Sequence, residues 1–363
     1  MDKIRKQNGY MAAVIICLMI VMVVCIIIVS GRKKSGEMEY RNTDFCMGTV
    51  LTITVYGSDG EQCTEDIKEL LDSLEKDVIS WRSVDSEVWK LNHEYKAGVP
   101  YAVSDELAAY IDKVKELYEN GNGLLDATIR PLAALWGIED GKSTVPDRDE
   151  IEAVLKNVDM GLVDIILETK ESERAAITIN QSDMSIDLGS VGKGIGCDKV
   201  YAYLRKSNVT GACIAIGGSI VIYGSKPDNS SYKLGIRNPR SETEAVMGVL
   251  QLEAGTNGIF VSTSGDYEKY FETDGTRYHH ILNPVTGYPA NEGLISATVV
   301  CDNGLISDGL STLSILLGRE GAMALLESYG AEAVLIDENK NVYVTDGLKD
   351  CFLLESDDYK VIE

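Results

Sequence analysis

The most informative stretch of this sequence is Asp187-Leu-Gly-Ser-Val-Gly-Lys-Gly-Ile-Gly196, with four glycines and one lysine in ten residues. Strand-like segments at 176–180 and 184–188 precede it, and residues 192–204 form a candidate helix. The glycines therefore lie at an expected strand-to-helix turn. Backbone amides exposed at such a turn, with a lysine beside them, suit a phosphate group. A purely structural glycine-rich turn explains the pattern equally well.

Three better-known motifs do not fit this stretch. Lys193 is followed by Gly194 instead of serine or threonine, which excludes a P-loop, and the glycine spacing does not match the dinucleotide fingerprint. Ser190 and Lys193 satisfy the S-x-x-K pattern of penicillin-recognising enzymes, but no S-D-N or K-T-G follows.

Outward from this stretch, short strands occur in runs and helices lie in groups between them, which predicts an α+β fold with antiparallel sheets. A second helix is expected between a Ser104 cap and Gly121. Residues 139–150 are expected to form a polar loop. The remaining expected strands are 50–56, 212–216, 220–223, 232–236, 246–252, 259–263 and 295–301, with a hairpin at 334–336 and 342–344; the remaining helices are 64–78, 308–317 and 322–329.

Two further clusters carry polar side chains that chemistry could use. His279 and His280 precede an Asn-Pro turn, although a packed strand histidine explains each of them. A Ser-His-Asp hydrolase is conceivable, but no G-x-S-x-G elbow exists. Asp308 and Thr312 are four residues apart and share one face of the expected helix. Their oxygens suit Mg²⁺ better than zinc, and a helix-capping aspartate is the alternative.

The composition excludes several classes of function. Removal of residues 1–34 leaves 28 basic and 56 acidic residues, a net charge of −28, which argues against non-specific binding of nucleic acid. The three histidines are too few for a multi-histidine metal centre. The eight cysteines are scattered without a C-x-x-C pair, so neither a zinc site nor a dense disulfide framework is expected.

The N-terminal segment predicts attachment to a membrane. Residues 11–29 form an uncharged stretch that is long enough to cross a bilayer as a helix. We expect residues 1–34 to form an uncleaved signal-anchor, followed by a polar linker over residues 30–44. A cleaved signal and a lipidated Cys25 are the alternatives.

The clusters, taken in their order along the chain, resemble the ApbE family of FAD:protein FMN transferases. The resemblance covers about residues 40–345 and depends on the ordered set rather than on any one motif. The matching elements are Met47-Gly-Thr49, Ser86-Glu87 with Asn92, Gly123-Leu-Leu-Asp-Ala-Thr128, Pro131-Leu132, Trp136-Gly137, Asp187-Leu-Gly-Ser-Val-Gly-Lys-Gly194, Ile216-Gly-Gly218, Thr263-Ser-Gly265, His280-Ile-Leu-Asn-Pro284, Thr286-Gly287 and Asp308-Gly-Leu-Ser-Thr312.

The resemblance implies a two-lobed α+β module of T-fold type over residues 35–363. It implies Mg²⁺-dependent transfer of the FMN half of FAD to a serine or threonine hydroxyl of an extracytoplasmic acceptor flavoprotein, with AMP leaving. Asp308 and Thr312 fall on metal-binding positions, with a backbone carbonyl near Ser190 as a further ligand. The FAD-contacting positions fall on Met47, Trp81, Asp126, Asp187, Lys193, Gly217, Gly218 and His280.

Some points stay open at this stage. Either His280 or Asp308 is the expected base for the acceptor hydroxyl, and Lys193 is expected to neutralise the pyrophosphate. Ser219 departs from the asparagine or aspartate usual in the family, and Trp81 replaces a tyrosine, although a flat ring can still stack on the flavin. An FAD pyrophosphatase and a non-catalytic flavin-binding surface protein are the alternative functions.

Overall fold

The fold is built on a nine-stranded sheet. The computed structural model describes residues 38–167, 174–241, 243 and 245–362. The sheet order is β1-β2-β6-β7-β10-β13-β14-β15-β17, and every neighbouring pair is antiparallel except β15 and β17. The strands are β1 (Glu39–Cys46), β2 (Thr49–Gly57), β6 (Val209–Ile216), β7 (Ser219–Gly224), β10 (Gly255–Gly265), β13 (Leu294–Cys301), β14 (Glu332–Asp337), β15 (Asn341–Val344) and β17 (Lys360–Ile362).

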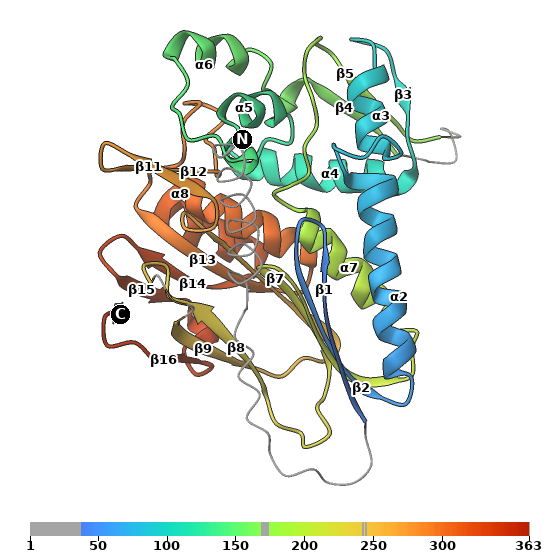
Figure 1. Ribbon diagram of the computed structural model, residues 1–363, viewed down its shortest axis with the longest axis vertical. Coiled ribbons are helices and arrows are strands. Elements are labelled where there is room, and N and C mark those ends of the chain that lie inside the picture. Colours follow the sequence, from blue (N-terminus) through green and yellow to red (C-terminus); the bar gives the residue numbers. More distant parts are fainter. Residues whose placement is uncertain (1–37, 168–173, 242, 244, 363) are drawn as a thin grey trace, which may run out of the picture.

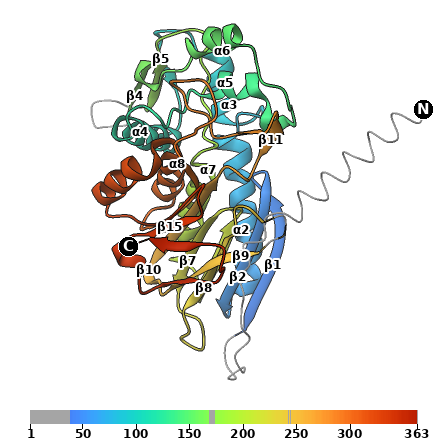
Figure 2. The ribbon, with the colours of Figure 1, turned by 90° about the vertical axis from the view of Figure 1, so that its left-hand side faces the viewer.

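Both faces of this sheet are covered (Figures 1 and 2). Helices α2 (Gly60–Ser73), α7 (Gly192–Leu204) and α8 (Gly304–Tyr329) pack on one face. A three-stranded sheet of β8 (Tyr232–Arg237), β9 (Val246–Leu252) and β16 (Phe352–Leu354) packs on the other. Along β6, alternate side chains enter the two cores, as the period of a strand requires.

A smaller group of elements forms the upper part of the molecule in Figure 1. It contains a three-stranded sheet and several short helices, and the hairpin β11–β12 lies beside it. Its members are α3 (Glu87–Glu94), β3 (Tyr101–Ala102), α4 (Asp105–Asn120), α5 (Arg130–Trp136), α6 (Arg148–Leu155), β4 (Val163–Ile166) and β5 (Ala176–Ile179); the hairpin strands are β11 (Tyr270–Thr273) and β12 (Thr276–His279). Short 3-10 turns occupy Ile138–Asp140 (η2), Met160–Leu162 (η3) and Asp346–Leu348 (η4).

Local chemistry sets several element boundaries where the sequence predicts them. The Ser104 side chain accepts a hydrogen bond from the Leu107 amide and caps α4, which ends before Gly121. The predicted helices at 308–317 and 322–329 are the two parts of α8, which are separated by a non-helical backbone at Gly318 (φ +68°). The prediction of an α+β fold with antiparallel sheets is confirmed.

Other predictions require correction. The expected linker is wrong over residues 39–44, because these pair with β2 as strand β1. The expected strand at 184–188 is absent: the segment makes only one isolated bridge, from Ser185 to Ile129. The helix expected at 64–78 begins at Gly60 and turns π-helical from Leu74 to Ile79. The loop expected at 139–150 begins within the 3-10 turn η2, which ends at Asp140, and is helical again from Arg148 onward.

The predicted anchor at 1–34 lies outside the described residues. Among the helices that the structure does describe, none combines the length and apolar character needed to cross a bilayer. The division into an anchor and a domain over residues 35–363 stays a prediction.

Candidate functional site

A cavity of about 320 Å³ brings together most of the residues that the sequence singles out. Its wall combines the β1–β2 turn, the start of α7, the end of β10 and the base of the β11–β12 hairpin. The predicted site residues that line it are Met47, Trp81, Asp126, Asp187, Ser190, Lys193, Gly218, His280 and Thr312. Gly217 and Asp308 are not part of this lining.

Asp308 lies buried behind the cavity wall and is held by three donors. Its Oδ2 accepts from the Gly194 amide at 2.9 Å and lies 3.4 Å from Lys193 Nζ. Its Oδ1 accepts from the Ser219 hydroxyl at 3.1 Å. Ser219, the position that departs from the family pattern, thus contributes to the site by fixing this carboxylate.

Thr312 lies one helical turn beyond Asp308, as the spacing predicts. Its Oγ1 is 3.3 Å from the Asp308 carbonyl oxygen and 3.2 Å from Ser264 Oγ. Within the described residues, no group of three or more histidine, cysteine, aspartate or glutamate side chains is arranged to hold a metal. The groups at the three predicted metal positions are the Asp308 carboxylate, the Thr312 hydroxyl and the backbone carbonyl of Ser190, an all-oxygen set that suits Mg²⁺ better than zinc.

The two glycine motifs serve close packing as well as ligand access. A Cβ on Gly194 would lie 2.1 Å from the Gly304 carbonyl oxygen, where α7 crosses α8. Gly217 has φ +56° in the β6–β7 turn, and a Cβ on Gly218 would lie 2.8 Å from the Thr263 carbonyl oxygen. The amide of Gly194 is already taken by Asp308, so the glycine-rich stretch is not a free cradle of amides along its whole length.

Two acidic residues of the lining, Asp126 and Asp187, bind the backbone. Asp126 accepts from the amides of Thr128 at 2.7 Å and Met160 at 2.9 Å, which ties two loops together. Asp187 accepts from the Gly189 amide at 2.8 Å. Burial raises the pKa of both carboxyl groups.

His280 occupies the base of the β11–β12 hairpin and remains unprotonated at neutral pH. Its amide donates to the Lys269 carbonyl oxygen at 3.0 Å, which continues the hairpin ladder. Burial, followed by the nearby Lys269 ammonium, lowers the pKa of His280 to about 4. Its buried Nδ1 has no hydrogen-bond partner among the described residues. This nitrogen is therefore available to a ligand.

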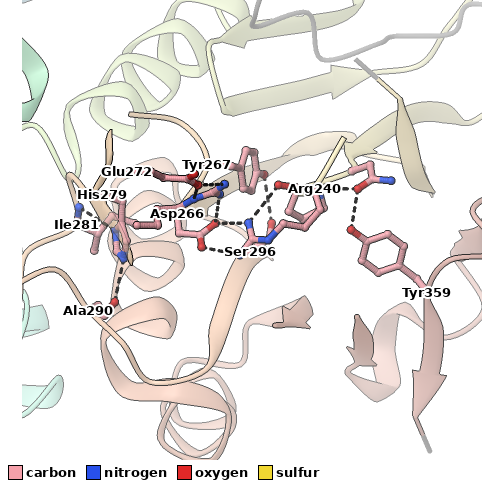
Figure 3. A network of polar contacts seen from close by, with 12 residues as sticks. Arg240, Asp266, Tyr267, Glu272, His279, Ile281, Ala290, Ser296 and Tyr359 are labelled. Carbon is pink, nitrogen blue, oxygen red and sulfur yellow. Dashed lines mark hydrogen bonds and ion pairs between the residues drawn. The ribbon is translucent and has the colours of Figure 1, made fainter. Parts of the chain in front are cut away.

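The neighbouring His279 has a structural role, as the packed-histidine alternative predicts (Figure 3). Its Nε2 lies 2.9 Å from the Ala290 carbonyl oxygen, and its Nδ1 accepts from the Ile281 amide at 3.3 Å. In the same network, Arg240 donates two bonds of 2.7 Å to the two oxygens of Asp266, the residue that follows β10. These contacts anchor the chain segments on both sides of the hairpin.

Glu139 of η2 links three segments at the cavity. Its Oε1 lies 2.8 Å from Lys269 Nζ, and its Oε2 lies 3.6 Å from an Arg82 guanidinium nitrogen. Burial alone would raise the pKa of Glu139, but Lys269, together with His280 and Arg82, more than offsets this and the pKa lies at about 2. Sequence reasoning missed this carboxylate, which lies in the segment expected to be a polar loop.

Trp81 lines the cavity, but both faces of its indole are covered. The guanidinium carbons of Arg82 and Arg130 lie 3.8 and 3.2 Å from the ring centroid. On one face these two carbons would be far closer to each other than van der Waals contact allows, so they lie on opposite faces. A flavin ring stacked on Trp81 would therefore have to replace one guanidinium. Arg82 is adjacent to Trp81 in the sequence, so its contact with the ring was predictable. Arg130 is remote in sequence, so its contact was not.

Comparisons with known proteins agree on one family. The model of the ApbE family matches residues 47–335. An FAD:protein FMN transferase of Klebsiella pneumoniae is 30% identical over 331 residues, covering 91% of this chain and 99% of that protein. One from Vibrio cholerae is 28% identical over 337 residues, covering 91% of this chain and 95% of that protein.

Solved structures give the same result. The ApbE protein of Thermotoga maritima is 28% identical with a TM-score of 0.76, covering 86% of this chain and 99% of that one. The flavin transferase ApbE from Vibrio cholerae is 26% identical with a TM-score of 0.74, covering 87% of this chain and 100% of that one.

Proposed function

Because the chain belongs to the ApbE family of transferases, we propose that it is an FAD:protein FMN transferase. In the proposed reaction, the P–O bond between the FMN phosphorus and the bridging oxygen of the FAD pyrophosphate breaks. A serine or threonine hydroxyl of an acceptor flavoprotein forms a phosphoester with the FMN phosphate, AMP leaves, and the hydroxyl proton passes to a base.

The arrangement around Asp308 is the observation that carries this proposal. Transfer of a phosphoryl group depends on positioning and on neutralising charge, with little covalent work for the protein. Lys193 provides a cation at the cavity wall, 3.4 Å from Asp308. Asp308, Thr312 and the carbonyl of Ser190 would hold Mg²⁺, which neutralises phosphate oxygens when bound.

Of the two candidate bases, the structure favours His280. Its imidazole is neutral at pH 7 because burial and Lys269 lower its pKa to about 4, and Nδ1 lacks a partner among the described residues. Asp308 is already committed to the amide of Gly194, the hydroxyl of Ser219 and the ammonium of Lys193. We therefore propose that His280 accepts the proton of the acceptor hydroxyl and that Asp308 positions the positive charges of the site.

Incubation of the protein with FAD, Mg²⁺ and an acceptor domain tests the proposal. Intact mass spectrometry of the acceptor should show one added FMN, and peptide mapping should place it on serine or threonine. Free FMN without any adduct would instead support the pyrophosphatase, and bound but unconverted FAD would support the non-catalytic alternative. Chelation with EDTA should stop the transfer.

We also propose that residues 1–34 tether the domain to the membrane on its extracytoplasmic side, next to its acceptors. The apolar stretch at 11–29 supports this. Membrane fractionation combined with external protease digestion of intact cells tests it. Recovery of the full chain in the soluble fraction would contradict the tether.

A further inference from the structure

A π-helical segment lies between α2 and the cavity. The α-helical bonding of α2 ends at Ser73, and Leu74–Ile79 continue with π-helical bonding, such as that from the Ser80 amide to the Glu75 carbonyl oxygen at 3.1 Å. Such segments are rare and often occur at functional sites. Trp81, which lines the cavity, follows directly.

Glu75, in this segment, binds the backbone of the β1–β2 turn. Its Oε2 accepts from the Met47 amide at 2.7 Å. Met47 has φ +49° and Gly48 has φ +70°, so both residues are in the left-handed region. The left-handed region is unfavourable for a residue that has a Cβ, such as Met47. Such a conformation persists only where neighbouring groups hold it. A carboxylate that accepts a hydrogen bond from a backbone amide is a strong restraint of this kind.

The held turn directs the Met47 side chain between α7 and the cavity. A Cβ placed on Gly196 would lie 3.2 Å from Met47 Sδ, so the thioether packs closely against α7. Met47, Gly48, Glu75 and Trp81 all line the same cavity. A thioether makes favourable contacts with aromatic rings, which suits one side of a flavin site.

We propose that Glu75 is a positioning residue for the flavin ring: it holds Met47 in its left-handed conformation, so that the thioether lines the cavity together with Trp81. This inference rests on the proposed FAD substrate and adds to it a residue whose effect is on ring binding, not on the transfer step.

The Glu75→Ala variant of the full-length protein tests this role. Its Kd and KM for FAD, from quenching of flavin fluorescence and from transfer kinetics, should rise about tenfold, the loss expected for one charge-assisted hydrogen bond. Turnover at saturating FAD should change little. Asp77→Asn is the matched control, because Asp77 is an exposed carboxylate of the same π-helical segment. It should bind FAD as the wild type does.

A double-mutant cycle separates positioning from a general effect on folding. Glycine adopts a positive φ without strain, so Met47→Gly should lose the thioether contact but no longer need Glu75. Removing Glu75 in that background should therefore raise Kd much less than it does with Met47 present. Equal losses in both backgrounds would overturn the proposal. If Glu75→Ala does not fold, Glu75→Gln, which keeps an acceptor oxygen, should show the same pattern with a smaller loss.

The outcomes distinguish this inference from the proposed function. A wild-type protein that does not bind FAD would overturn both. A wild type that binds FAD, with a Glu75→Ala variant of unchanged Kd and KM, would overturn only the role of Glu75.

Discussion

Gly194 of α7 and Gly304 of α8 meet where the two helices cross. A Cβ on either residue would lie within 2.3 Å of the other's carbonyl oxygen. The same crossing brings the Gly194 amide to the Asp308 carboxylate at 2.9 Å. The close approach of the two backbones therefore sets the position of the buried carboxylate relative to Lys193.

Gly194→Ala should force the crossing apart. We expect a loss of about 1 to 3 kcal/mol in the free energy of unfolding, because the added methyl group meets backbone that cannot move aside cheaply. Urea denaturation measures this loss. Gly192→Ala is the control, since its Cβ would meet only Ile79 Cδ1 at 3.5 Å and Met47 Cε at 4.0 Å. Equal stability of the two variants would contradict the role of the crossing.

Asp308→Asn should lower FMN transfer on the order of 100-fold, a typical loss when one fixed electrostatic group is removed from a site. The variant keeps the shape of the side chain but removes the charge that faces Lys193. Titration of transfer with Mg²⁺ should show a weaker metal response. Asp302→Asn, an exposed carboxylate in the loop before α8, should behave as the wild type. Wild-type transfer by Asp308→Asn would refute the assignment.

Glu139→Gln should destabilise the protein at pH 7. The pKa of Glu139 lies at about 2, below the ordinary value of 4.5, so its ionised form contributes stability above pH 4.5. That contribution is lost as pH falls toward 2. We expect the substitution to lower the free energy of unfolding by about 1 to 3 kcal/mol at pH 7. This is less than the full value that the pKa shift implies, because the side chain is partly exposed. Denaturation curves from pH 7 to pH 3 should show that the difference in free energy of unfolding between the variant and the wild type becomes smaller. The control, Asp140→Asn, should show no such narrowing.

His280→Gln should reduce the acid sensitivity of folding. The unfolded chain binds a proton on this histidine at its ordinary pKa of 6.5, whereas the folded chain binds it only near 4. Stability therefore falls as pH decreases from 6.5 to 4, and the variant should lack this component. Thermal melting across that range measures the difference. His93→Gln, at an exposed position of α3, should leave the wild-type slope unchanged.

The sequence predicts elements whose signals are local. Ser104 and Gly121 bound α4 because a cap and a helix end depend on neighbouring residues. Asp308 and Thr312 share a helix face because their spacing requires it. Residues 184–188 show the limit of such signals: their alternating pattern predicts a strand, but the Asn92 side chain takes both the amide and the carbonyl of Ile186. Side-chain bonding replaces a sheet ladder there.

Contacts between distant segments could not be predicted from local patterns. Arg130 reaches Trp81 from α5, and Glu139 reaches Lys269 across the cavity. Nothing in either sequence neighbourhood indicates the partner. The resemblance to a family predicts which residues contact the ligand, but Glu75, Glu139 and Arg130 act on other side chains or on the backbone, and only the folded chain shows them.

The guanidinium groups on both faces of Trp81 have a spectroscopic consequence. The chain contains three tryptophans, and two of them, Trp81 and Trp136, line the cavity. The emission of an indole depends on the charges and rings against its faces. Exchange of an arginine for a flavin ring at Trp81 would alter that emission, so the protein carries an intrinsic optical probe of its own site and needs no added label.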